Sequence, residues 1–425
     1  MGVWQQLEER ATGGRAAKVA IVGAGYVGSS LLHRLRRTPG IDPVLVVNRT
    51  VDHGRAAWAG AGVDPSDLCV SDDPTTLADA IDRGVPALST AAEAVALEHL
   101  DVVVEVTGSI EHGATTALTA LEAGRHVVSL NAEADATVGY LLHHVAREHG
   151  VVYTISDGDQ PGGMLRTHNW VRAMGFEPVV VANCKRHLDR FQNPTTSAPY
   201  AERDGTSVEV TTSAGDGTKL QIECAVVANA TGFEPDCRGM HGVPTTLEHA
   251  VDDLRATESR DHVVEYTLGG DFGAGVVVVG RTHDHDVVER SLRFYKMGPG
   301  PDYLFLRPHT LAQFEMAETI ADAWINGHAL ATPVGPPVAE VVTMAKRDLQ
   351  AGEALDGIGG YTGYGAIDTT ARAEGLLPIA FAHGAVLRVD VPRDAPIPLD
   401  AVEIDDSSPL HALRRRQASL VAHAR

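Results

Sequence analysis

A glycine-rich segment near the start of the chain has the spacing of a dinucleotide-binding loop. It reads GAGYVG, fits the pattern G-x-G-x-x-G, and follows an apolar run at 19–22 that predicts a strand. In this pattern the first glycine permits a tight turn, the second lets backbone N–H groups approach a pyrophosphate, and the third lets helix and strand pack closely. The segment predicts a nicotinamide dinucleotide site, the alternative being a turn in a domain that has lost its cofactor. The predicted loop residues are Gly23, Gly25, Tyr26, Val27 and Gly28.

The end of the second predicted strand favours NADP over NAD. A site for NAD usually has an acidic residue here that binds the ribose 2′-hydroxyl, whereas this chain has Asn48 and Arg49. An arginine at this position can pair with the 2′-phosphate of NADP. The alternative is that Arg49 stacks on adenine or faces solvent. We therefore expect NADP as the cofactor, with NAD as the alternative.

Two polar segments follow predicted strands at 101–108 and 126–131, where the carboxyl ends of parallel strands line the ligand crevice. Thr107, Gly108 and Asn131 are therefore expected near the nicotinamide. Two readings remain open for the acidic residues that follow. Glu133 and Asp135 either line the crevice or belong to the first turn of the next helix, where negative charge favours the helix dipole.

Lysine is rare in this chain, with five residues against 30 arginines, and three of the five fall in its middle part. Lys219 stands at a predicted helix start with Asp216 nearby. A lysine in such a setting can give a proton to a carbonyl group or polarise it. The alternative is an exposed ion pair worth about 0.5 kcal/mol. The candidate catalytic residues are Lys219, Asp216, Lys185 and Lys296, with Lys185 expected to bind an anion.

A polar, glycine-rich segment at 157–163 lies at a predicted domain junction. Its carboxylates can hold a cation or orient substrate hydroxyls, and a hinge is the competing reading. No metal is assigned, although Asp157 and Asp159 are candidate ligands; the run at 283–286 predicts a solvated turn because no third ligand has diagnostic spacing. The predicted substrate-binding residues are Asp159, Gln160, Arg186, Asn193 and Thr195, with a solvated loop as the alternative for the last three.

Charge and cysteine usage narrow the class of partner. The chain has 35 Lys and Arg against 56 Asp and Glu, a net charge of −21, which argues against nucleic acid or an anionic membrane as partner. Its four cysteines form no C-x-x-C pair, and no apolar run reaches membrane-spanning length. We expect a cytoplasmic protein that acts on a small molecule.

The elements that must position these residues change in rhythm along the chain. Residues 1–157 alternate short apolar runs with helical segments, which predicts an α/β Rossmann domain with a doubly wound parallel sheet. Residues 158–330 predict a mixed-sheet α+β substrate domain, with strands that include 206–213. The predicted helix at 311–327 either belongs to this domain or packs back on the first domain. A proline-rich linker then opens a small β-rich module within 331–425.

The segments GAGYVG, DVVVEVTGS and ALEAGRHVVSLNAE resemble the cofactor domain of homoserine dehydrogenases. That family joins a Rossmann domain to a mixed-sheet domain that binds substrate and forms the dimer. Asp216 and Lys219 resemble its catalytic aspartate and lysine, although they stand three positions apart where four are expected. Ala132 replaces the lysine that usually follows the asparagine of the nicotinamide segment.

Four further segments, GDQPGG, NCKRHLDRFQNPTT, AVVANATGF and LRFYKMGPGPDYLFLRPH, are similar to homoserine-dehydrogenase-like oxidoreductases with a C-terminal SAF domain. This subgroup includes enzymes like 1-deoxyxylulose 5-phosphate reductoisomerase. The resemblance implies a homodimer that transfers a hydride between NADP(H) and a carbonyl or alcohol of a small, polar, anionic substrate. One alternative is an NADPH- and metal-dependent reductoisomerase acting on a sugar phosphate. Another is a non-catalytic NADP-binding sensor or scaffold.

Overall fold

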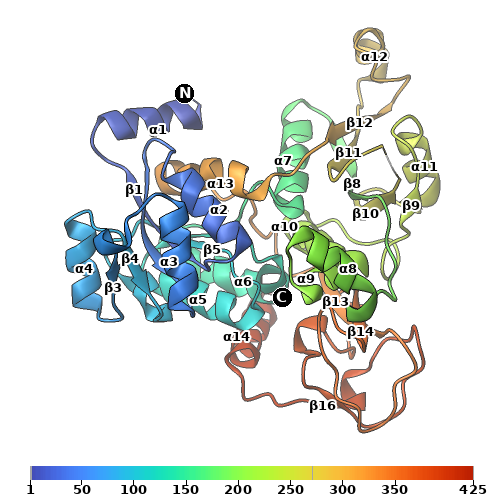
Figure 1. The fold of residues 1–425 in the computed structure, drawn as a ribbon. Helices are drawn as coiled ribbons and strands as arrows, with labels where there is room; N and C mark the ends of the chain where they lie inside the picture. The colour runs from blue at the N-terminus through green and yellow to red at the C-terminus, as the bar shows by residue number, and fades with distance from the viewer. Residues whose placement is uncertain (1, 270, 425) are drawn as a thin grey trace. The chain divides into compact units, whose positions relative to one another are not determined.

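The computed structural model describes residues 2–269 and 271–424, which form two compact units (Figure 1). Unit 1 comprises residues 2–162, 311–332 and 409–424. Unit 2 comprises the remaining described residues, 163–310 and 333–408. Each unit has its own sheet and hydrophobic core.

Unit 1 contains a seven-stranded parallel sheet in the order β3-β4-β2-β1-β5-β6-β7. Its central strands are runs of Val, Ile and Ala that are buried on both faces, as a parallel sheet covered by helices requires. The chain reverses direction across the sheet between β1 and β5, the type of position where doubly wound sheets bind ligands. The strands are β1 (Ala17–Val22), β2 (Ile41–Val47), β3 (Cys69–Val70), β4 (Ala87–Ser89), β5 (Val102–Glu105), β6 (His126–Ser129) and β7 (Tyr153–Ile155).

Crossover helices connect these strands, so the predicted α/β doubly wound fold is confirmed. Gly124 and Gly150, which the sequence marks as helix stops, both adopt positive φ just after helices. The helices and helical turns of this part are α1 (Val3–Thr12), α2 (Tyr26–Leu35), α3 (Val51–Gly60), η1 (Pro65–Asp67), α4 (Pro74–Asp82), η2 (Ala92–Ala96), α5 (Ile110–Glu122) and α6 (Ala132–Glu148).

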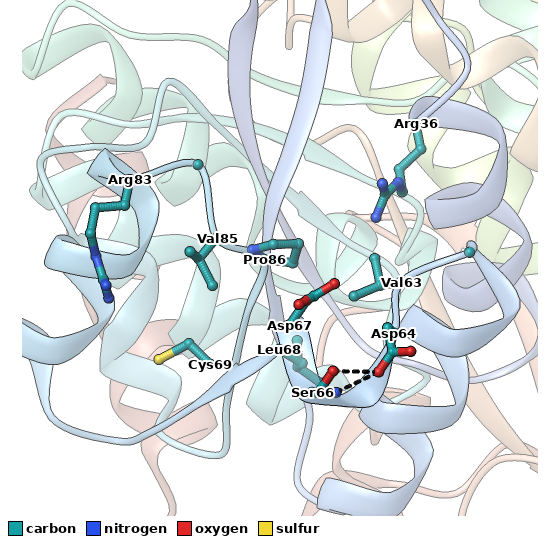
Figure 2. Close-up of a pocket in the computed structure, with 12 residues that line it drawn as sticks. Arg36, Val63, Asp64, Ser66, Asp67, Leu68, Cys69, Arg83, Val85 and Pro86 are labelled. Atoms are coloured by element: carbon teal, nitrogen blue, oxygen red, sulfur yellow. Dashed lines mark hydrogen bonds between the residues drawn. The ribbon is translucent and has the colours of Figure 1, made fainter.

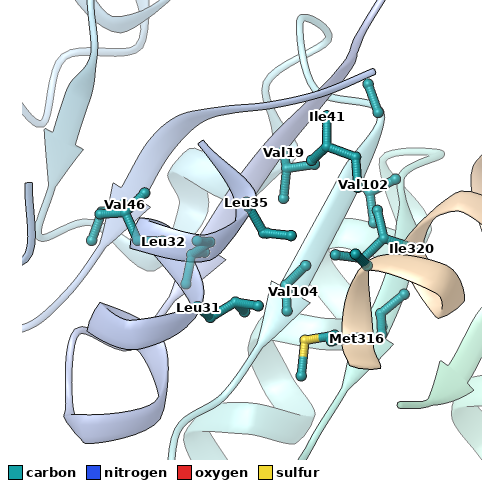
Figure 3. Packing of buried hydrophobic residues seen from close by; sticks show 14 of the residues in the cluster. Val19, Leu31, Leu32, Leu35, Ile41, Val46, Val102, Val104, Met316 and Ile320 are labelled. Atoms are coloured by element: carbon teal, nitrogen blue, oxygen red, sulfur yellow. The ribbon is translucent and has the colours of Figure 1, made fainter. Parts of the chain in front are cut away.

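Two later segments of the chain complete unit 1. Helix α13 (Ala312–Ala321), continued by η3 (Asp322–Asn326), adds Met316 and Ile320 to the apolar core beneath α2 (Figure 3). Helix α14 (Pro409–Ala424) lies on α6. The Gln417 amide group accepts from Leu141 N at 3.0 Å and donates to Thr137 O at 3.1 Å. The sequence analysis grouped these last residues with the β-rich module, because a single helix carries no mark of the partner that buries it.

Unit 2 contains a five-stranded mixed sheet in the order β12-β11-β8-β10-β9. Strand β8 pairs parallel with β10 and antiparallel with β11, so the predicted mixed sheet is confirmed. The strands are β8 (Glu177–Lys185), β9 (Val243–Pro244), β10 (Val263–Leu268), β11 (Val276–Arg281) and β12 (Asp302–Arg307). The helices are α7 (Gln160–Ala173), which enters from unit 1, α8 (Pro194–Asp204), α9 (Val208–Gly215), α10 (Thr218–Thr231), α11 (Ala250–Thr257) and α12 (His285–Phe294).

One predicted strand is wrong. The segment 206–213 alternates polar and apolar residues, yet it forms helix α9. Ser207 caps this helix by accepting from Val210 N at 3.2 Å, and the helix packs on α8 and α10. Capping and tertiary packing thus override the strand propensity of Val and Thr at this position.

The last part of unit 2 is β-rich, as predicted for the segment after the proline-rich linker. Strands β13 (Ala339–Ala345) and β14 (Gly363–Thr369) pair antiparallel over seven residues. A smaller pair, β15 (Val386–Leu387) and β16 (Val402–Glu403), follows, with short helical turns η4 (Ile379–Phe381) and η5 (Leu399–Ala401). Its assignment as a SAF domain stays a prediction, as do the three domain boundaries. No helix in the described part of the chain is long and apolar enough to cross a membrane.

Candidate active site

The glycine loop between β1 and α2 has the shape that a dinucleotide requires. Gly23 adopts φ +106°, which side chains with a Cβ rarely tolerate. A Cβ on Gly28 would fall 1.9 Å from Gly23 O, so helix and turn approach too closely for any other residue. A Cβ on Gly25 would meet nothing within 4 Å, and this glycine precedes the positive end of α2. The loop therefore leaves open backbone where a pyrophosphate would bind.

The end of β2 lies against this loop. Asn48 accepts from Ala24 N at 2.9 Å and donates to Thr50 O at 2.7 Å, so it holds the two loops together. The neighbouring Arg49 is exposed and, among the described residues, has no hydrogen-bond or ion-pair partner. Its guanidinium is thus available to an anionic ligand at this edge of the sheet.

The polar residues after β5 and β6 form one connected network beside the glycine loop. Glu105, at the end of β5, is buried and accepts from Thr107 N at 2.7 Å. Asn131 caps α6 by accepting from Ala134 N at 2.9 Å, and it donates to Ser109 O at 3.0 Å. Contact with Gly23 is close, because a Cβ there would lie 3.2 Å from the Thr107 side chain. The network fixes the backbone of the loop after β5.

Two carboxyl groups in this region are perturbed by burial. Burial raises the pKa of Glu105 to about 7, and hydrogen bonds from Thr107 oppose the shift. Burial also raises the pKa of Asp135 to about 7, opposed by a hydrogen bond from Tyr153. Glu105 is the last residue of β5, and Asp135 lies in the first turn of α6. Glu133 lies in the same turn and is half-buried. Glu133 and Asp135 therefore both belong to the first turn of α6, which was one of the two interpretations of these residues.

The other predicted cofactor residues lie at the same edge of the sheet in unit 1. Tyr26 is 73% exposed and Val27 is half-buried, both at the start of α2. Gly108 is exposed, and a Cβ there would meet nothing within 4 Å. The predicted cofactor residues thus lie together at the carboxyl end of a doubly wound sheet; they are the glycine loop, Asn48, Arg49, Thr107 and Asn131. Their roles toward the cofactor stay predictions.

A pocket elsewhere in unit 1 lies at the opposite edge of the sheet. Its lining includes Leu68 and Pro86, which precede β3 and β4, and Arg36, which ends α2 (Figure 2). These positions mark the amino ends of the strands, whereas ligands of doubly wound sheets bind beyond the carboxyl ends. This pocket is therefore not the predicted dinucleotide site.

In unit 2, two of the predicted lysines meet at one buried glutamate. Lys185, at the end of β8, places Nζ 3.9 Å from Glu223 Oε2, and Lys219, in the first turn of α10, places Nζ 3.7 Å from Glu223 Oε1. Asn183 donates to the same carboxylate at 2.8 Å. The Glu223 side chain is fully buried, whereas those of Lys185 and Lys219 are 21% and 33% exposed. The cluster therefore presents two ammonium groups toward solvent from one buried anion.

Local structure explains why these residues meet. Gly217 adopts φ +88° and begins α10, and a Cβ there would clash with Leu188, which follows β8. The turn before α10 and the loop after β8 therefore pack tightly. Lys219 and Glu223 stand four residues apart on one helix face. Glu223 is buried on the side of α10 that contacts Asn183 of β8, and Lys219 lies one turn before it, at the start of the helix.

Asp216 has a different partner from the one that its spacing suggested. Its Oδ2 lies 2.7 Å from Lys346 Nζ, and both side chains are almost completely buried. Lys346 also donates to Gly360 O at 2.7 Å, and Asp216 accepts from Thr218 N at 2.8 Å. The pair ties the start of α10 to the β13–β14 region. The sequence analysis expected Asp216 to act with Lys219, because a partner 130 positions away leaves no local signal.

The remaining predicted residues lie apart from this cluster. Lys296 is exposed and follows α12, a helix with no buried residue. Asn193 caps α8 through Thr195 N and Thr196 N, and Arg186 is exposed. The Thr195 hydroxyl lies 3.0 Å from the Tyr361 hydroxyl. These contacts agree with the solvated-loop reading, and the binding roles stay predictions.

Asp157, Asp159 and Gln160 belong to unit 1. Asp157 accepts from Gly158 N at 2.8 Å, and its own N–H donates to Thr319 at 3.0 Å. Asp157 and Asp159 are buried, but neither belongs to a group of three metal-ligating side chains in the described residues. Their role as metal ligands stays a prediction.

The sequence analysis missed Glu223, Asn183 and Glu105 as site residues. Glu223 had a usable signal, because an acid four positions after a lysine faces it on a helix. Asn183 is two residues before Lys185, so both side chains point to the same face of β8. Glu105 interrupts a run of valines at a strand end, and a charged residue there has to be neutralised or paired.

Two protein-family models match these two regions of the chain. Residues 23–155 match the NAD-binding domain of homoserine dehydrogenase. Residues 158–316 match the catalytic domain of oxidoreductase DRL, and this range contains the cluster of Lys185, Lys219 and Glu223. No curated protein matches the chain.

Similar solved structures include a homoserine dehydrogenase from Thiobacillus denitrificans, with 13% identity, 90% of this chain and 98% of that chain covered, and a TM-score of 0.44. GenD2 from gentamicin A biosynthesis, in complex with NAD, has 14% identity, coverage of 74% and 88%, and a TM-score of 0.37. 1-Deoxy-D-xylulose 5-phosphate reductoisomerase from Zymomonas mobilis, in complex with NADPH, has 18% identity, coverage of 49% and 57%, and a TM-score of 0.35.

Proposed function

We propose that this chain, an NAD(P)-dependent oxidoreductase with an NAD-binding domain of the homoserine dehydrogenase type, transfers a hydride between NADP(H) and a carbonyl or alcohol carbon of a small anionic substrate. The observation that carries the proposal is the cluster of Lys185 and Lys219 on buried Glu223. It lies within the segment that matches an oxidoreductase catalytic domain.

The cluster suits an anionic substrate. Two ammonium groups lie within 4 Å of one carboxylate at a partly exposed position. Lys219 also lies in the first turn of α10, where the helix dipole favours negative charge. The chain has a net charge of −21, which repels anions, so these two ammonium groups supply the local positive charge that an anionic substrate needs.

Each residue has a distinct task in this mechanism. When bound, the nicotinamide supplies or accepts the hydride. Lys219 Nζ gives a proton to the substrate oxygen as the carbonyl carbon is reduced, and takes it back in the reverse direction. Lys185 holds the carboxylate or phosphate of the substrate. Glu223, fixed by Asn183, orients both ammonium groups and is a positioning residue.

The cofactor residues of unit 1 are part of the proposal. Gly25 leaves room for the pyrophosphate at the start of α2, and Arg49 binds the 2′-phosphate that distinguishes NADP from NAD. Thr107, Gly108 and Asn131 line the nicotinamide end, with Glu105 holding Thr107 in place. The homodimer expected from the resemblance also belongs to the proposal, and light scattering of the purified chain checks it.

The test follows NADPH oxidation with a panel of oxo acids, aldehydes and sugar phosphates. For the substrate that is turned over, K219A should lower kcat by about 10²- to 10⁴-fold, the range for loss of a general acid. K185A should mainly raise KM, by about 10-fold or more, because it removes a charged hydrogen bond to the substrate anion. Both variants should bind NADPH normally, because the nucleotide residues named above lie in unit 1.

Lys18→Ala is the matched control. Its side chain is 35% exposed and lies 3.8 Å from Asp82, so it loses a similar ion pair far from the cluster in sequence. Equal activity of K219A and K18A would overturn the role of Lys219. Nucleotide binding without oxidation for every compound would favour a sensor, and turnover of a sugar phosphate that EDTA abolishes would favour a reductoisomerase.

A further inference from the structure

A second group of ligating side chains lies in unit 2 and takes no part in the proposed hydride transfer. The loop between α10 and β9 carries Asp236 and His241, and Glu258 follows α11. One ligand atom from each of these three residues lies within 4.8 Å of the other two. Among the described residues, these are the three His, Cys, Asp or Glu side chains that lie close enough together to bind one metal ion.

Glu258 is the unusual member of the group. The residue is only 8% exposed, and neither carboxylate oxygen has a hydrogen-bond partner among the described residues. Burial without partners is costly for a carboxyl group and far more so for a carboxylate. The structure therefore leaves an acid that lacks its neutralising partner.

Two neighbouring side chains, Glu265 and Arg255, act electrostatically on Glu258. Glu265 is fully buried and already accepts from His241 N at 2.9 Å, Gly242 N at 3.0 Å and Tyr266 N at 2.7 Å. The positive charge of Arg255 acts on Glu258, but this guanidinium forms its ion pairs with Asp261 and with Asp302. A proton shared between Glu258 and Glu265 or a bound cation would neutralise the site.

The other two ligands are already oriented toward one another. His241 Nε2 lies 3.0 Å from Asp236 Oδ2, and Asp236 also accepts from the Ser259 hydroxyl and from Ser259 N. The His241 side chain is 31% exposed and that of Asp236 11% exposed, so solvent reaches the group through His241. Such an arrangement offers three protein ligands and one accessible position.

We propose that Asp236, His241 and Glu258 form a binding site for a first-row divalent cation. One imidazole nitrogen and two carboxylates suit Zn²⁺ or Mn²⁺, whereas Mg²⁺ and Ca²⁺ prefer an all-oxygen set. Three protein ligands leave a coordination position for water or for an oxygen of a small molecule. The bound cation joins the loop at 236–241 to the turn that precedes β10, and it compensates the charge of Glu258. The site is independent of the proposed substrate class.

The test measures metal binding by the full chain after chelator treatment and dialysis. Titration with Zn²⁺ against a chromophoric chelator should show one equivalent bound per chain, with Mg²⁺ at the same concentration not competing. H241A, D236N and E258Q should each weaken Zn²⁺ binding at least about 10-fold, the effect that changes to outer-shell groups already reach. Thermal unfolding should shift upward with Zn²⁺ in the native chain and not in H241A, because a ligand that binds only the folded state stabilises it.

His283→Ala is the matched control. His283 also bonds a carboxylate, Glu177 Oε2 at 2.8 Å, but its side chain is 72% exposed. Loss of Zn²⁺ in H241A with retention in H283A supports the site. The reverse pattern, or no stoichiometric binding by the native chain, would overturn it and leave a shared proton as the partner of Glu258. Since His241 is exposed, H241A should fold, and its circular dichroism spectrum without metal verifies this.

Discussion

The buried acids beside the glycine loop of unit 1 and those around α10 of unit 2 have different partners. In unit 1, Glu105 accepts from Thr107 and Ser129, and Asp135 lies by Tyr153; burial raises the pKa of both acids to about 7. In unit 2, Glu223 and Asp216 lie within ion-pair distance of lysines. Burial therefore shifts the acids beside the predicted cofactor loop toward the protonated form without a lysine nearby among the described residues, whereas those around α10 have ammonium groups beside them.

Exposure divides the lysine-paired acids of unit 2 further. The side chain of Lys346 is 2% exposed, and its remaining partner is a backbone carbonyl, so it has no surface for a ligand. Lys219 and Lys185 are 33% and 21% exposed. The same pairing chemistry therefore serves packing at Asp216 and is available for binding at Glu223. Three substitutions, Lys346→Met, Glu105→Gln and Arg49→Ala, each with a control, test the comparison between the two units.

The largest effect is expected when the cation is removed from the buried Asp216–Lys346 pair. Lys346→Met leaves Asp216 as a buried charge without its counter-ion, which should lower the free energy of unfolding by about 3–5 kcal/mol. Hydrogen exchange of β13, β14 and the start of α10 measures this, because it reports unit 2 separately from unit 1.

The double variant D216N/K346M is the control. Removing both charges should recover much of the lost stability, since no uncompensated ion remains. If K346M left protection in these strands unchanged while abolishing turnover, the Asp216–Lys346 pair would instead belong to the catalytic machinery.

The sequence predicted the fold class of both units because their signals are local. The glycine spacing at 23–28 and the alternation of apolar runs with helices report neighbours within a few residues. The segment 206–213 shows the limit of this approach. Its alternating pattern is equally local, yet packing against α8 and α10 determines that it is a helix.

The candidate site was predictable only in part, for the same reason. Lysine scarcity singled out Lys185 and Lys219, and both meet at Glu223. The pairing of Asp216 with Lys346 spans 130 positions, and the position of α14 depends on contacts with α6. Neither has a periodicity or motif, because long-range contacts are fixed by the assembled core rather than by spacing.

A smaller effect on the free energy of unfolding is expected at Glu105, a buried acid whose pKa is raised by burial. Glu105 has an ordinary pKa of 4.5, raised to about 7 in the folded chain. The folded state therefore holds this proton more tightly, and the free energy of unfolding should fall as pH rises from 4.5 to about 7, by about 3 kcal/mol in all. Glu105→Gln keeps the shape and removes the titration, so its stability should vary less over this range. Hydrogen exchange of β5 and β6 at several pH values measures it.

Asp135 supplies the internal control for this variant. Burial raises its pKa to about 7 as well, so E105Q should retain part of the pH dependence and E105Q/D135N should lose most of it. An unchanged slope in E105Q would mean that Glu105 is charged in the folded chain, and the distinction between the two units would fail.

The smallest effect concerns a cation of unit 1 that has no acid beside it. Arg49 is exposed and, in the described chain, unpaired, so its removal should leave stability unchanged. If its partner is the 2′-phosphate of NADP, Arg49→Ala should weaken NADP binding about 10-fold, the loss of one charged hydrogen bond, and leave NAD binding unchanged. Calorimetric titration with both nucleotides measures the ratio. Arg55→Ala, an exposed arginine of α3, is the matched control. Equal weakening for both nucleotides would place Arg49 on the adenine instead, because stacking does not distinguish NADP from NAD.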